Sequence, residues 1–476
     1  MKIRNFRILG AVLAALLPAC GGGGHGSGGT SGGETSNPAF PVTMTDPKGG
    51  QTFTAPATIS LSAVAVDPAS IAKVEFAEVI GPASAPNTWS RGTVMTTSTQ
   101  PPFQATWADA PAGTHTLVAI ATDSLGTQTF SNPVTINVLP PGVSPGGWVP
   151  IAMVWGNPSG FWFVDADRGW AVGNGSHSDS PASGVDGTVL RTSDGGTTWV
   201  PQSTFQDVSL GKIQFIDSHR GWILGRVHHP GSPDFEGTVL RTTDGGATWI
   251  SSSVPSDNPW ALSFVDADVG WVGGIGTGSI SATKDGGVTW TAQPTMPDVA
   301  SIPVVRFVDR QSGWVLGDSG TRGGPQQILH TTDGGQTWTE QLRTGPNEFF
   351  GALEFVSPTT GWVSRVLLGP PPLGGPALNG GILFTSDGGA TWTEQASSGS
   401  DPIAPLEFVS ATQGWAGVNA SIIHTEDGGS SWVTQPIPGQ DAPTSFGKIQ
   451  FLDAKVGWAM RGDGLLFKTT TGGKAP

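Results

Sequence analysis

The chain has 476 residues, a formal net charge of −14, one cysteine, no tyrosine and 19 tryptophans. The acidic balance disfavours nucleic acid as a ligand, because binding of phosphates requires clustered Lys and Arg. A single cysteine excludes an intramolecular disulfide, so the fold must be held by its core, and the many tryptophans argue against a disordered chain.

Residues 1–19 have the pattern of an export signal, in which three positive charges precede an apolar stretch too short to span a bilayer. The stretch ends in Leu-Pro-Ala-Cys, which resembles a bacterial lipobox, although a small residue is more usual where Pro18 stands. We therefore expect Cys20 to carry a lipid anchor, and an ordinary signal peptide followed by a free thiol is the alternative. Residues 20–39, rich in Gly and Ser, are expected to form a flexible tether.

Residues 40–140 contain short runs with the two-residue alternation typical of β-strands. These runs are 58–63, 73–76, 102–107, 113–123 and 134–138. About 100 residues is the usual size of an immunoglobulin-like sandwich, and the segment resembles the bacterial immunoglobulin-like domains found beside surface or carbohydrate-active modules. Since no residue here suggests catalysis, we expect this domain to be a spacer.

Residues 146–476 form a repeat array. A Gly-Trp pair recurs seven times, at Trp170, Trp222, Trp271, Trp314, Trp362, Trp415 and Trp458. The motif Asp-Gly-Gly-x-Thr/Ser-Trp recurs six times, beginning at Asp194, Asp244, Asp285, Asp333, Asp387 and Asp427. Successive Gly-Trp pairs are 43 to 53 residues apart, which is enough for one four-stranded blade of a β-propeller.

The seventh repeat lacks a fourth strand, because the chain passes Gly472 and Gly473 without the Trp that follows in the other copies. Gly-Gly-Trp-Val-Pro at residues 146–150 resembles the Gly-Gly-Thr-Thr-Trp-Val-Pro that enters the first repeat's fourth strand. We expect residues 146–150 to pair with the C-terminal hairpin and close the ring, which removes exposed strand edges. The predicted fold class is all-β, a seven-bladed β-propeller preceded by an immunoglobulin-like β-sandwich.

The turn motif matches the Asp-box, or bacterial neuraminidase repeat, which sialidases, xyloglucanases and sortilin-like receptors share. The fuller unit, Phe-x-Asp-x-x-x-Gly-Trp followed by Leu-x-Thr-x-Asp-Gly-Gly-x-Thr-Trp, is similar to the photosystem II stability/assembly factor propellers and their bacterial relatives. That resemblance implies a non-catalytic propeller that holds a membrane-protein assembly intermediate. The lipoprotein-like start and the immunoglobulin-like domain depart from the photosynthetic members.

We expect the Asp-box carboxylates to be structural and the binding residues to lie on the opposite face, where loops of variable length enter each blade. Arg226, Arg365 and Arg461 stand at or just beyond the end of a Gly-Trp strand, and Arg322 lies in a long loop. These arginines are candidates for binding acidic groups of a partner, as the resemblance to the assembly factors implies. Scattered, solvated charges are the alternative.

Trp155 and Trp260 lie in loops that enter the first and third blades. They are candidates for an aromatic platform that receives a sugar or a peptide, and packing between blades is the alternative.

A sialidase mechanism is excluded, because it uses a Tyr nucleophile and the chain has no tyrosine. Glu354 and Glu407 precede the strand Phe of neighbouring blades and are the candidate carboxylate pair of another kind of glycosidase. Xyloglucanases, however, work in a cleft between two propellers. The doublet His228-His229 lacks the spaced partners of a zinc site, so neither a metal nor another cofactor is expected.

These features predict a lipid-anchored, extracytoplasmic protein of the bacterial cell envelope, periplasmic or at the cell surface. It would bind a protein partner of the envelope, membrane proteins included. The alternative is a carbohydrate-binding or glycoside hydrolase module of sialidase-like fold, which requires Glu354 and Glu407 to face a common cleft.

Overall fold

The structure is a computed structural model. It describes residues 42–79, 91–141, 147–154, 158–176, 185–229, 235–256, 258–276, 278, 280–321, 324–345, 348–368, 377–399, 403–438 and 444–474. The predicted signal peptide, Cys20 and the tether lie outside the described residues. Within the described ranges, no helix is long and apolar enough to cross a membrane.

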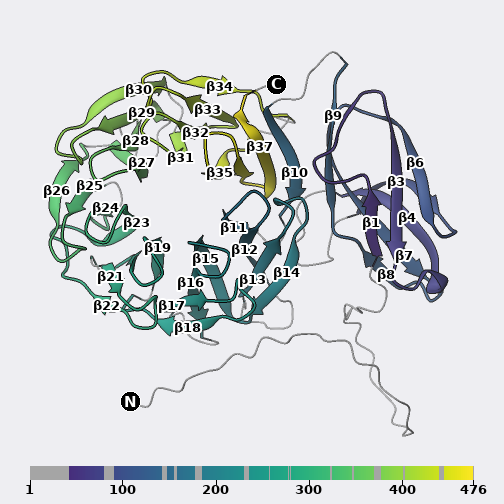
Figure 1. Ribbon diagram of the computed structural model, residues 1–476, viewed down its shortest axis with the longest axis horizontal. Coiled ribbons are helices and arrows are strands. Elements are labelled where there is room, and N and C mark those ends of the chain that lie inside the picture. The colour runs from purple at the N-terminus through teal and green to yellow at the C-terminus, as the bar shows by residue number, and fades with distance from the viewer. Residues whose placement is uncertain are drawn as a thin grey trace, which may run out of the picture.

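The N-terminal part is a sandwich of two sheets (Figure 1). The first sheet has the order β1-β3-β6, with β1 (Val42–Asp46), β3 (Ala57–Ala65) and β6 (Phe103–Ala110). The second has the order β2-β9-β7-β4-β5, with β8 beside β7. Its strands are β2 (Thr52–Thr54), β4 (Ile71–Val79), β5 (Arg91–Ser98), β7 (Gly113–Asp123), β8 (Gln128–Phe130) and β9 (Val134–Leu139). Along β3, Ile59, Leu61 and Ala63 alternate inward with the more exposed Ser60 and Ser62, as a half-buried strand requires.

Seven blades of four strands form the ring beside the sandwich (Figure 1), and a parallel bridge between Asp186 and Val208 joins blades 1 and 2 into one eight-stranded sheet. Blades 1 and 2 are β11 (Pro158–Phe163), β12 (Gly169–Ser176), β13 (Val185–Thr192), β14 (Val200–Phe205), and β15 (Val208–Phe215), β16 (Gly221–His228), β17 (Phe235–Thr242), β18 (Ile250–Ser253). Blades 3 and 4 are β19 (Pro259–Phe264), β20 (Gly270–Gly274), β21 (Ile280–Thr283), β22 (Thr291–Ala292), and β23 (Ser301–Phe307), β24 (Gly313–Asp318), β25 (Gln326–Thr331), β26 (Thr339–Arg343). Blades 5 and 6 are β27 (Glu348–Phe355), β28 (Gly361–Leu368), β29 (Ala377–Thr385), β30 (Thr393–Gly399), and β31 (Ile403–Phe408), β32 (Gly414–Val418), β33 (Ser421–Thr425), β34 (Val433–Gln435).

Blade 7 is built from both ends of the propeller segment. It consists of β35 (Phe446–Phe451), β36 (Gly457–Arg461), β37 (Leu465–Gly473) and, as its outer strand, β10 (Gly147–Met153). β10 runs antiparallel to β37, with Val149 opposite Lys468 and Pro150 opposite Phe467. Trp148 is fully buried, and its Nε1 donates to Oε1 of Gln435 at 2.7 Å. The predicted all-β fold and the pairing that closes its ring are therefore both observed.

Each Gly-Trp indole connects its blade to the next one. All seven rings stack on the strand Phe of the following blade, with centroids 3.5 to 3.8 Å apart. All seven Nε1 groups also donate to a Gly carbonyl in the turn that follows the third strand of the next blade, at 2.8 to 3.0 Å. Trp458 makes these contacts with Phe163 and Gly195, so the same joint links the last blade to the first.

The Gly before each Trp is required by packing within its own blade. The strand Phe lies across this Gly, and a Cβ at Gly169 would stand 2.6 Å from the ring of Phe163. The other six positions are equally close, so a side chain here would displace the Phe on which the neighbouring indole stacks.

We call the Asp-Gly-Gly turn between the third and fourth strands of a blade the DGG turn. In blade 1, Asp194 accepts hydrogen bonds from the backbone N of Thr198 at 2.9 Å and from the hydroxyls of Thr192 and Thr198 at 2.8 and 2.6 Å. Gly195 and Gly196 have φ of +72° and +93°, which favours glycine. The other five Asp residues accept the same three bonds, so these carboxylates hold the turn itself.

Candidate functional site

The two faces of the ring carry different structures. The DGG turns lie on the same face as the turns between first and second strands, since Gly195 N donates to Asp167 O at 2.7 Å and the other blades repeat this bond. Because neighbouring strands are antiparallel, the loops between second and third strands and the loops entering each first strand lie on the opposite face. We call this opposite side the loop face.

Arg226 lies on the loop face, at the end of the second strand of blade 2. Its guanidinium carbon is 5.6 Å from the ring centroid of Trp260 and 6.0 Å from that of Phe235. Its Nη1 donates to Oδ1 of Asn258 at 3.0 Å. Trp260 is 44% exposed and Phe235 is 42% exposed. We call these four residues the blade 2–3 patch.

The fold explains how the blade 2–3 patch forms. Arg226 pairs in register with Gly237, two residues after Phe235, while Asn258 and Trp260 begin the inner strand of the next blade. A cation over an aromatic face gains about 0.5–1 kcal/mol at an exposed site. Among the described residues, no carboxylate forms an ion pair with Arg226, and its hydrogen-bond partner Asn258 is a neutral amide.

The other candidate arginines differ from Arg226. Arg365 forms ion pairs with Glu348 at 3.3 Å and Glu394 at 2.6 Å, and Arg461 forms one with Asp463 at 2.7 Å. Arg226, Arg365 and Arg461 stand on blades 2, 5 and 7, so the structure places them on one face without gathering them into a cluster. Arg322 and Trp155 lie outside the described residues.

Glu354 and Glu407 occupy a position that connects neighbouring blades. This position, directly before the strand Phe, holds Trp162, Gln214, Ser263, Arg306, Glu354, Glu407 and Gln450 in blades 1 to 7. We call these the connector residues.

The two glutamine connectors show the pattern most fully. Gln214 accepts from Phe264 N at 2.9 Å and donates to Phe264 O at 2.8 Å, and Gln450 makes the same two bonds to Phe163. In each case one amide satisfies both backbone groups at the same residue of the next blade.

The two carboxyl connectors are buried among charges. Glu354 is 7% exposed and pairs with Arg306, while Glu407 is half-buried and accepts from the backbone N of Phe451. Burial raises the pKa of Glu354 to about 8, with Arg306 opposing and Glu407 adding to the rise. Burial likewise raises the pKa of Glu407 to about 7, against the nearby charges of Arg306 and Lys448. The two carboxyls are electrostatic neighbours; Glu407 bonds to the backbone of the next blade, whereas Glu354 pairs with the connector Arg306 of the preceding blade.

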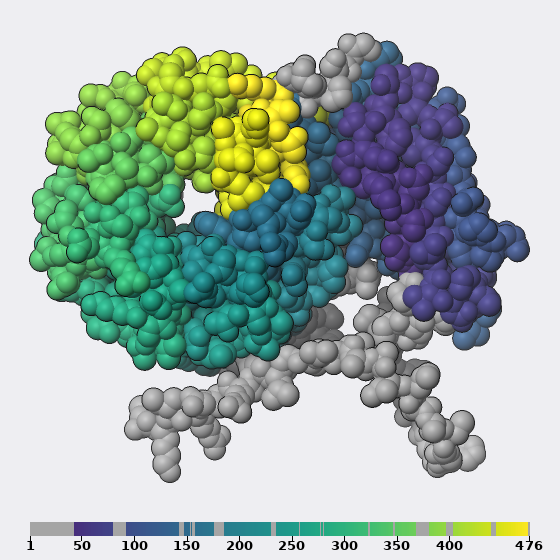
Figure 2. Space-filling view, in the orientation of Figure 1, coloured from purple at the N-terminus to yellow at the C-terminus, as the bar shows by residue number. Residues whose placement is uncertain are grey.

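The innermost strands surround an opening at the centre of the ring (Figure 2). Lys448 on β35 donates to the carbonyl of Phe161 at 2.5 Å, and its Nζ stands 4.9 Å from the ring centroid of Trp162. Burial, together with the charge of Lys212, lowers the pKa of Lys448 to about 7. The inner wall therefore brings Lys448 close to both Lys212 and the carboxyl of Glu407.

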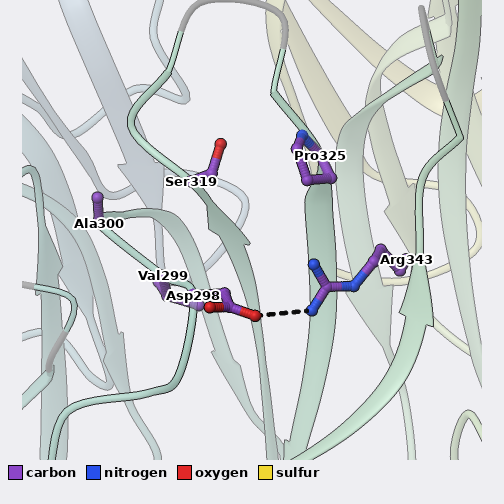
Figure 3. A pocket seen from close by; sticks show the side chains of 6 residues that line it. All are labelled: Asp298, Val299, Ala300, Ser319, Pro325 and Arg343. Atoms are coloured by element: carbon purple, nitrogen blue, oxygen red, sulfur yellow. Dashed lines mark hydrogen bonds and ion pairs between the residues drawn. The ribbon is translucent and has the colours of Figure 1, made fainter.

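Blade 4 has a hollow on the loop face (Figure 3). Its volume is about 420 Å³, and its lining residues are Asp298, Val299, Ala300, Ser319, Pro325 and Arg343. Arg343 is paired with Glu340 at 2.7 Å and with Asp298 at 3.5 Å, so its charge is compensated. This hollow lacks the two separated carboxylates that glycoside hydrolysis needs.

Among the described residues, no group of three or more His, Cys, Asp or Glu side chains is placed to hold a metal ion. His228 contacts the hydroxyl of Ser209 at 3.0 Å, and His229 faces Glu236 at 3.7 Å. These two neighbouring histidines thus have different partners.

Three residues of these sites were not predicted from the sequence, namely Phe235, Asn258 and Arg306. Arg306 could have been found, because alignment of the seven repeats places it at the same position as Glu354 and Glu407. Phe235 and Asn258 occupy loop ends that differ from blade to blade, and no repeat pattern marks them.

The comparisons with known proteins agree with this architecture. Residues 41–119 match the family model described as a bacterial Ig domain. This match confirms the expected immunoglobulin-like domain. No curated protein matches the chain.

Two solved structures of YCF48 resemble the propeller. The YCF48 from Cyanidioschyzon merolae is 22% identical, with 68% of this chain and 98% of that chain covered and a TM-score of 0.50. YCF48 bound to D1 peptide is 21% identical, with 70% and 99% covered and a TM-score of 0.49. The GH74 xyloglucanase from Xanthomonas campestris is 14% identical, with 69% of this chain and 54% of the enzyme covered and a TM-score of 0.49. At these identities the likeness is one of fold, and the YCF48 structure with a TM-score of 0.50 confirms the predicted propeller at that level.

Proposed function

We propose that this chain is a membrane-anchored, extracytoplasmic propeller that binds a partner protein of the cell envelope and does no chemistry on it. The loop face supplies the binding surface, and the blade 2–3 patch is its centre. Lipidation of Cys20 would provide the anchor, and neither a metal nor another cofactor takes part.

The observation that carries this proposal is the state of Arg226. Its guanidinium lies between two partly exposed aromatic rings and is paired with no carboxylate of the described residues. Arginine and tryptophan are enriched at the energetic centres of protein interfaces, because they combine a large contact area with directed hydrogen bonds. A peptide that brings a carboxylate to Arg226 and an apolar side chain to Trp260 satisfies both groups.

A protein ligand fits the blade 2–3 patch better than a sugar. A sugar stacks on the open face of an aromatic ring, whereas the guanidinium of Arg226 already lies over both Trp260 and Phe235. A carboxylate can approach the same guanidinium from the solvent side and form a charge-assisted pair.

The test is affinity capture from native cell envelopes, with the full-length lipidated protein as bait. Arg226→Glu should reduce the captured partner at least about tenfold, the effect of a lost interaction of about 1.4 kcal/mol. Its Tm should stay within about 3 °C of the wild type, because surface substitutions change stability by about 0.5 kcal/mol.

The matched control is Lys284→Glu, an equal charge change at an exposed residue of blade 3 on the DGG-turn face. It should leave capture intact. Undiminished capture by Arg226→Glu, or equal loss in both variants, would reject the patch.

A glycoside hydrolase is the second candidate, and one observation favours it. Burial raises the pKa of Glu354 to about 8, as in a carboxyl kept protonated to act as a general acid. Against it, Glu354 is engaged with Arg306 and Glu407 with the backbone of Phe451. Release of reducing sugar from envelope glycans by the wild type, abolished in Glu354→Gln, would establish this alternative instead.

A further inference from the structure

The central strand β7 of the second sheet is buried on both faces. Along β7, Leu117 and Ala119 point into the core of the sandwich, whereas Val118 and Ile120 belong to a separate cluster that includes Ile151 of the propeller. The four β7 side chains are all fully buried. Because successive residues of a strand point to opposite faces, one face of this sheet packs on the sandwich and the other on the ring.

The cluster shared with the ring crosses the seam between its last and first blades. Besides Ile151 of β10, it contains Leu466 and Trp458 of blade 7 and Phe163 and Leu190 of blade 1. Figure 1 shows the sandwich beside β10, and Figure 2 shows its surface against this part of the ring.

The loop between β1 and β2 makes a second contact across the same seam. A Cβ at Gly49 would lie 2.5 Å from Cγ2 of Thr197 and 3.0 Å from the carbonyl oxygen of Ile151. Thr197 belongs to the DGG turn of blade 1, and Ile151 belongs to the outer strand of blade 7. This loop therefore touches both sides of the seam at close range.

The strand at this seam is held differently from the other outer strands. In blades 1 to 6 a DGG turn joins the third strand to the fourth, whereas β10 and β37 are far apart in the chain. Their register shifts between Gly147 and Val149 and again between Pro150 and Ala152, and Pro150 has no N–H to donate. The outer strand of blade 1 also has a register shift and a proline, Pro201, so the feature that sets β10 apart is that no turn joins it to β37.

From these contacts we infer that the sandwich is a clamp that keeps the propeller closed. Its apolar sheet face covers β10, and its Gly49 loop spans from β10 to blade 1. A spacer joined to the ring only through the linker would leave Val118 and Ile120 facing water.

The test is hydrogen exchange with mass spectrometry on the full-length protein. Val118→Thr places a hydroxyl in the shared cluster while keeping a β-branched side chain, and it should speed exchange of residues 147–153 about tenfold or more. Val64→Thr is the matched control, because Val64 is 53% exposed on the other sheet. It should leave β10 at the wild-type rate.

A second variant approaches the clamp from the loop. Gly49→Leu should force the loop away from Thr197 and Ile151 without entering the sandwich core, and it should also speed exchange in β10. If Val118→Thr also speeds exchange in β3 and β6, the sandwich itself has loosened. The exchange rate of β10 in Gly49→Leu then decides whether the sandwich holds the ring closed. Wild-type exchange of β10 in Gly49→Leu would overturn the proposal.

Discussion

His115 is a buried residue whose surroundings select its charged form. Its Nδ1 lies 2.9 Å from Oε1 of Glu78 and its Nε2 lies 2.9 Å from the carbonyl oxygen of Pro111. Both neighbours are acceptors, so only the doubly protonated ring satisfies both. Burial alone would lower the pKa of His115, but the bonds to Glu78 and Pro111 outweigh it and raise the pKa above its usual 6.5.

The consequence is a stability of the sandwich that depends on pH. Because the pKa of His115 is raised in the folded state, its contribution to the free energy of unfolding is full below about pH 6.5. That contribution is lost as the pH rises through the raised pKa. Gln at position 115 cannot be protonated, so the Tm of His115→Gln should change less between pH 6 and pH 9 than the Tm of the wild type. Each kcal/mol lost lowers Tm by about 4 °C or more in a domain of this size.

Calorimetry of both proteins at the two pH values measures this difference. If Tm changes equally with pH in the wild type and in His115→Gln, protonation of the imidazole does not contribute to stability.

At the scale of the strands, the connector residues join each inner strand to the next blade. Gln214 and Gln450 both donate to and accept from one backbone residue. Glu407 accepts from Phe451 N, and it can donate to the neighbouring carbonyl only when it is protonated. A neutral glutamate at this position therefore reproduces the bonds of a glutamine.

This equivalence predicts the effect of Glu407→Gln. Burial raises the pKa of Glu407 to about 7. The contribution of its protonated form to stability is therefore full below about pH 4.5 and is lost as the pH rises through about 7. The variant should be more stable than the wild type at pH 9, by at most about 3 kcal/mol, and nearly equal to it at pH 4. Denaturant unfolding monitored by tryptophan fluorescence checks both values.

The reciprocal variant is Gln450→Glu, which places a titratable group at the equivalent position of blade 7. It should introduce a loss of stability with rising pH, moderated by Arg306, Lys448 and Lys212 around the opening. A Glu407→Gln variant that keeps the pH slope of the wild type would contradict the role assigned to the connectors.

Much of the element structure could be predicted from the chain alone. The Gly-Trp and Asp-Gly-Gly spacings fix blade number and hairpins, because they encode contacts that are local, such as Phe163 against Gly169. Six of the seven indoles donate to a glycine carbonyl 57 to 75 residues away, and Trp458 donates to one 263 residues away, so these partners leave no local pattern. The neighbourhood of Arg226 leaves none either.

One signal was present but was interpreted too simply. The unbroken apolar run from Leu117 to Ala121 is typical of a strand buried on both faces. The expectation of a spacer rested on the lack of catalytic residues and did not use this run, whereas the structure packs this strand between the sandwich core and the ring.

At the scale of the whole molecule, the proposed attachment to the membrane depends on one residue. Cys20→Ser should move the protein from the membrane fraction to the soluble fraction, because durable anchoring relies on several acyl chains at about 0.8 kcal/mol per buried CH₂. Incorporation of labelled palmitate by wild type and variant measures the modification itself. Retention of Cys20→Ser in membranes after an alkaline wash would place the anchor elsewhere.

The division of blade 7 between two distant strands has a consequence for biosynthesis. β10 precedes and β37 follows every other strand of the propeller along the chain. A nascent chain therefore carries an unpaired outer strand, with the indole of Trp148 awaiting Gln435, until the final blade has emerged. Truncation before β37 therefore leaves this edge open to aggregation and to proteases, and the ring can close only once β37 has been made.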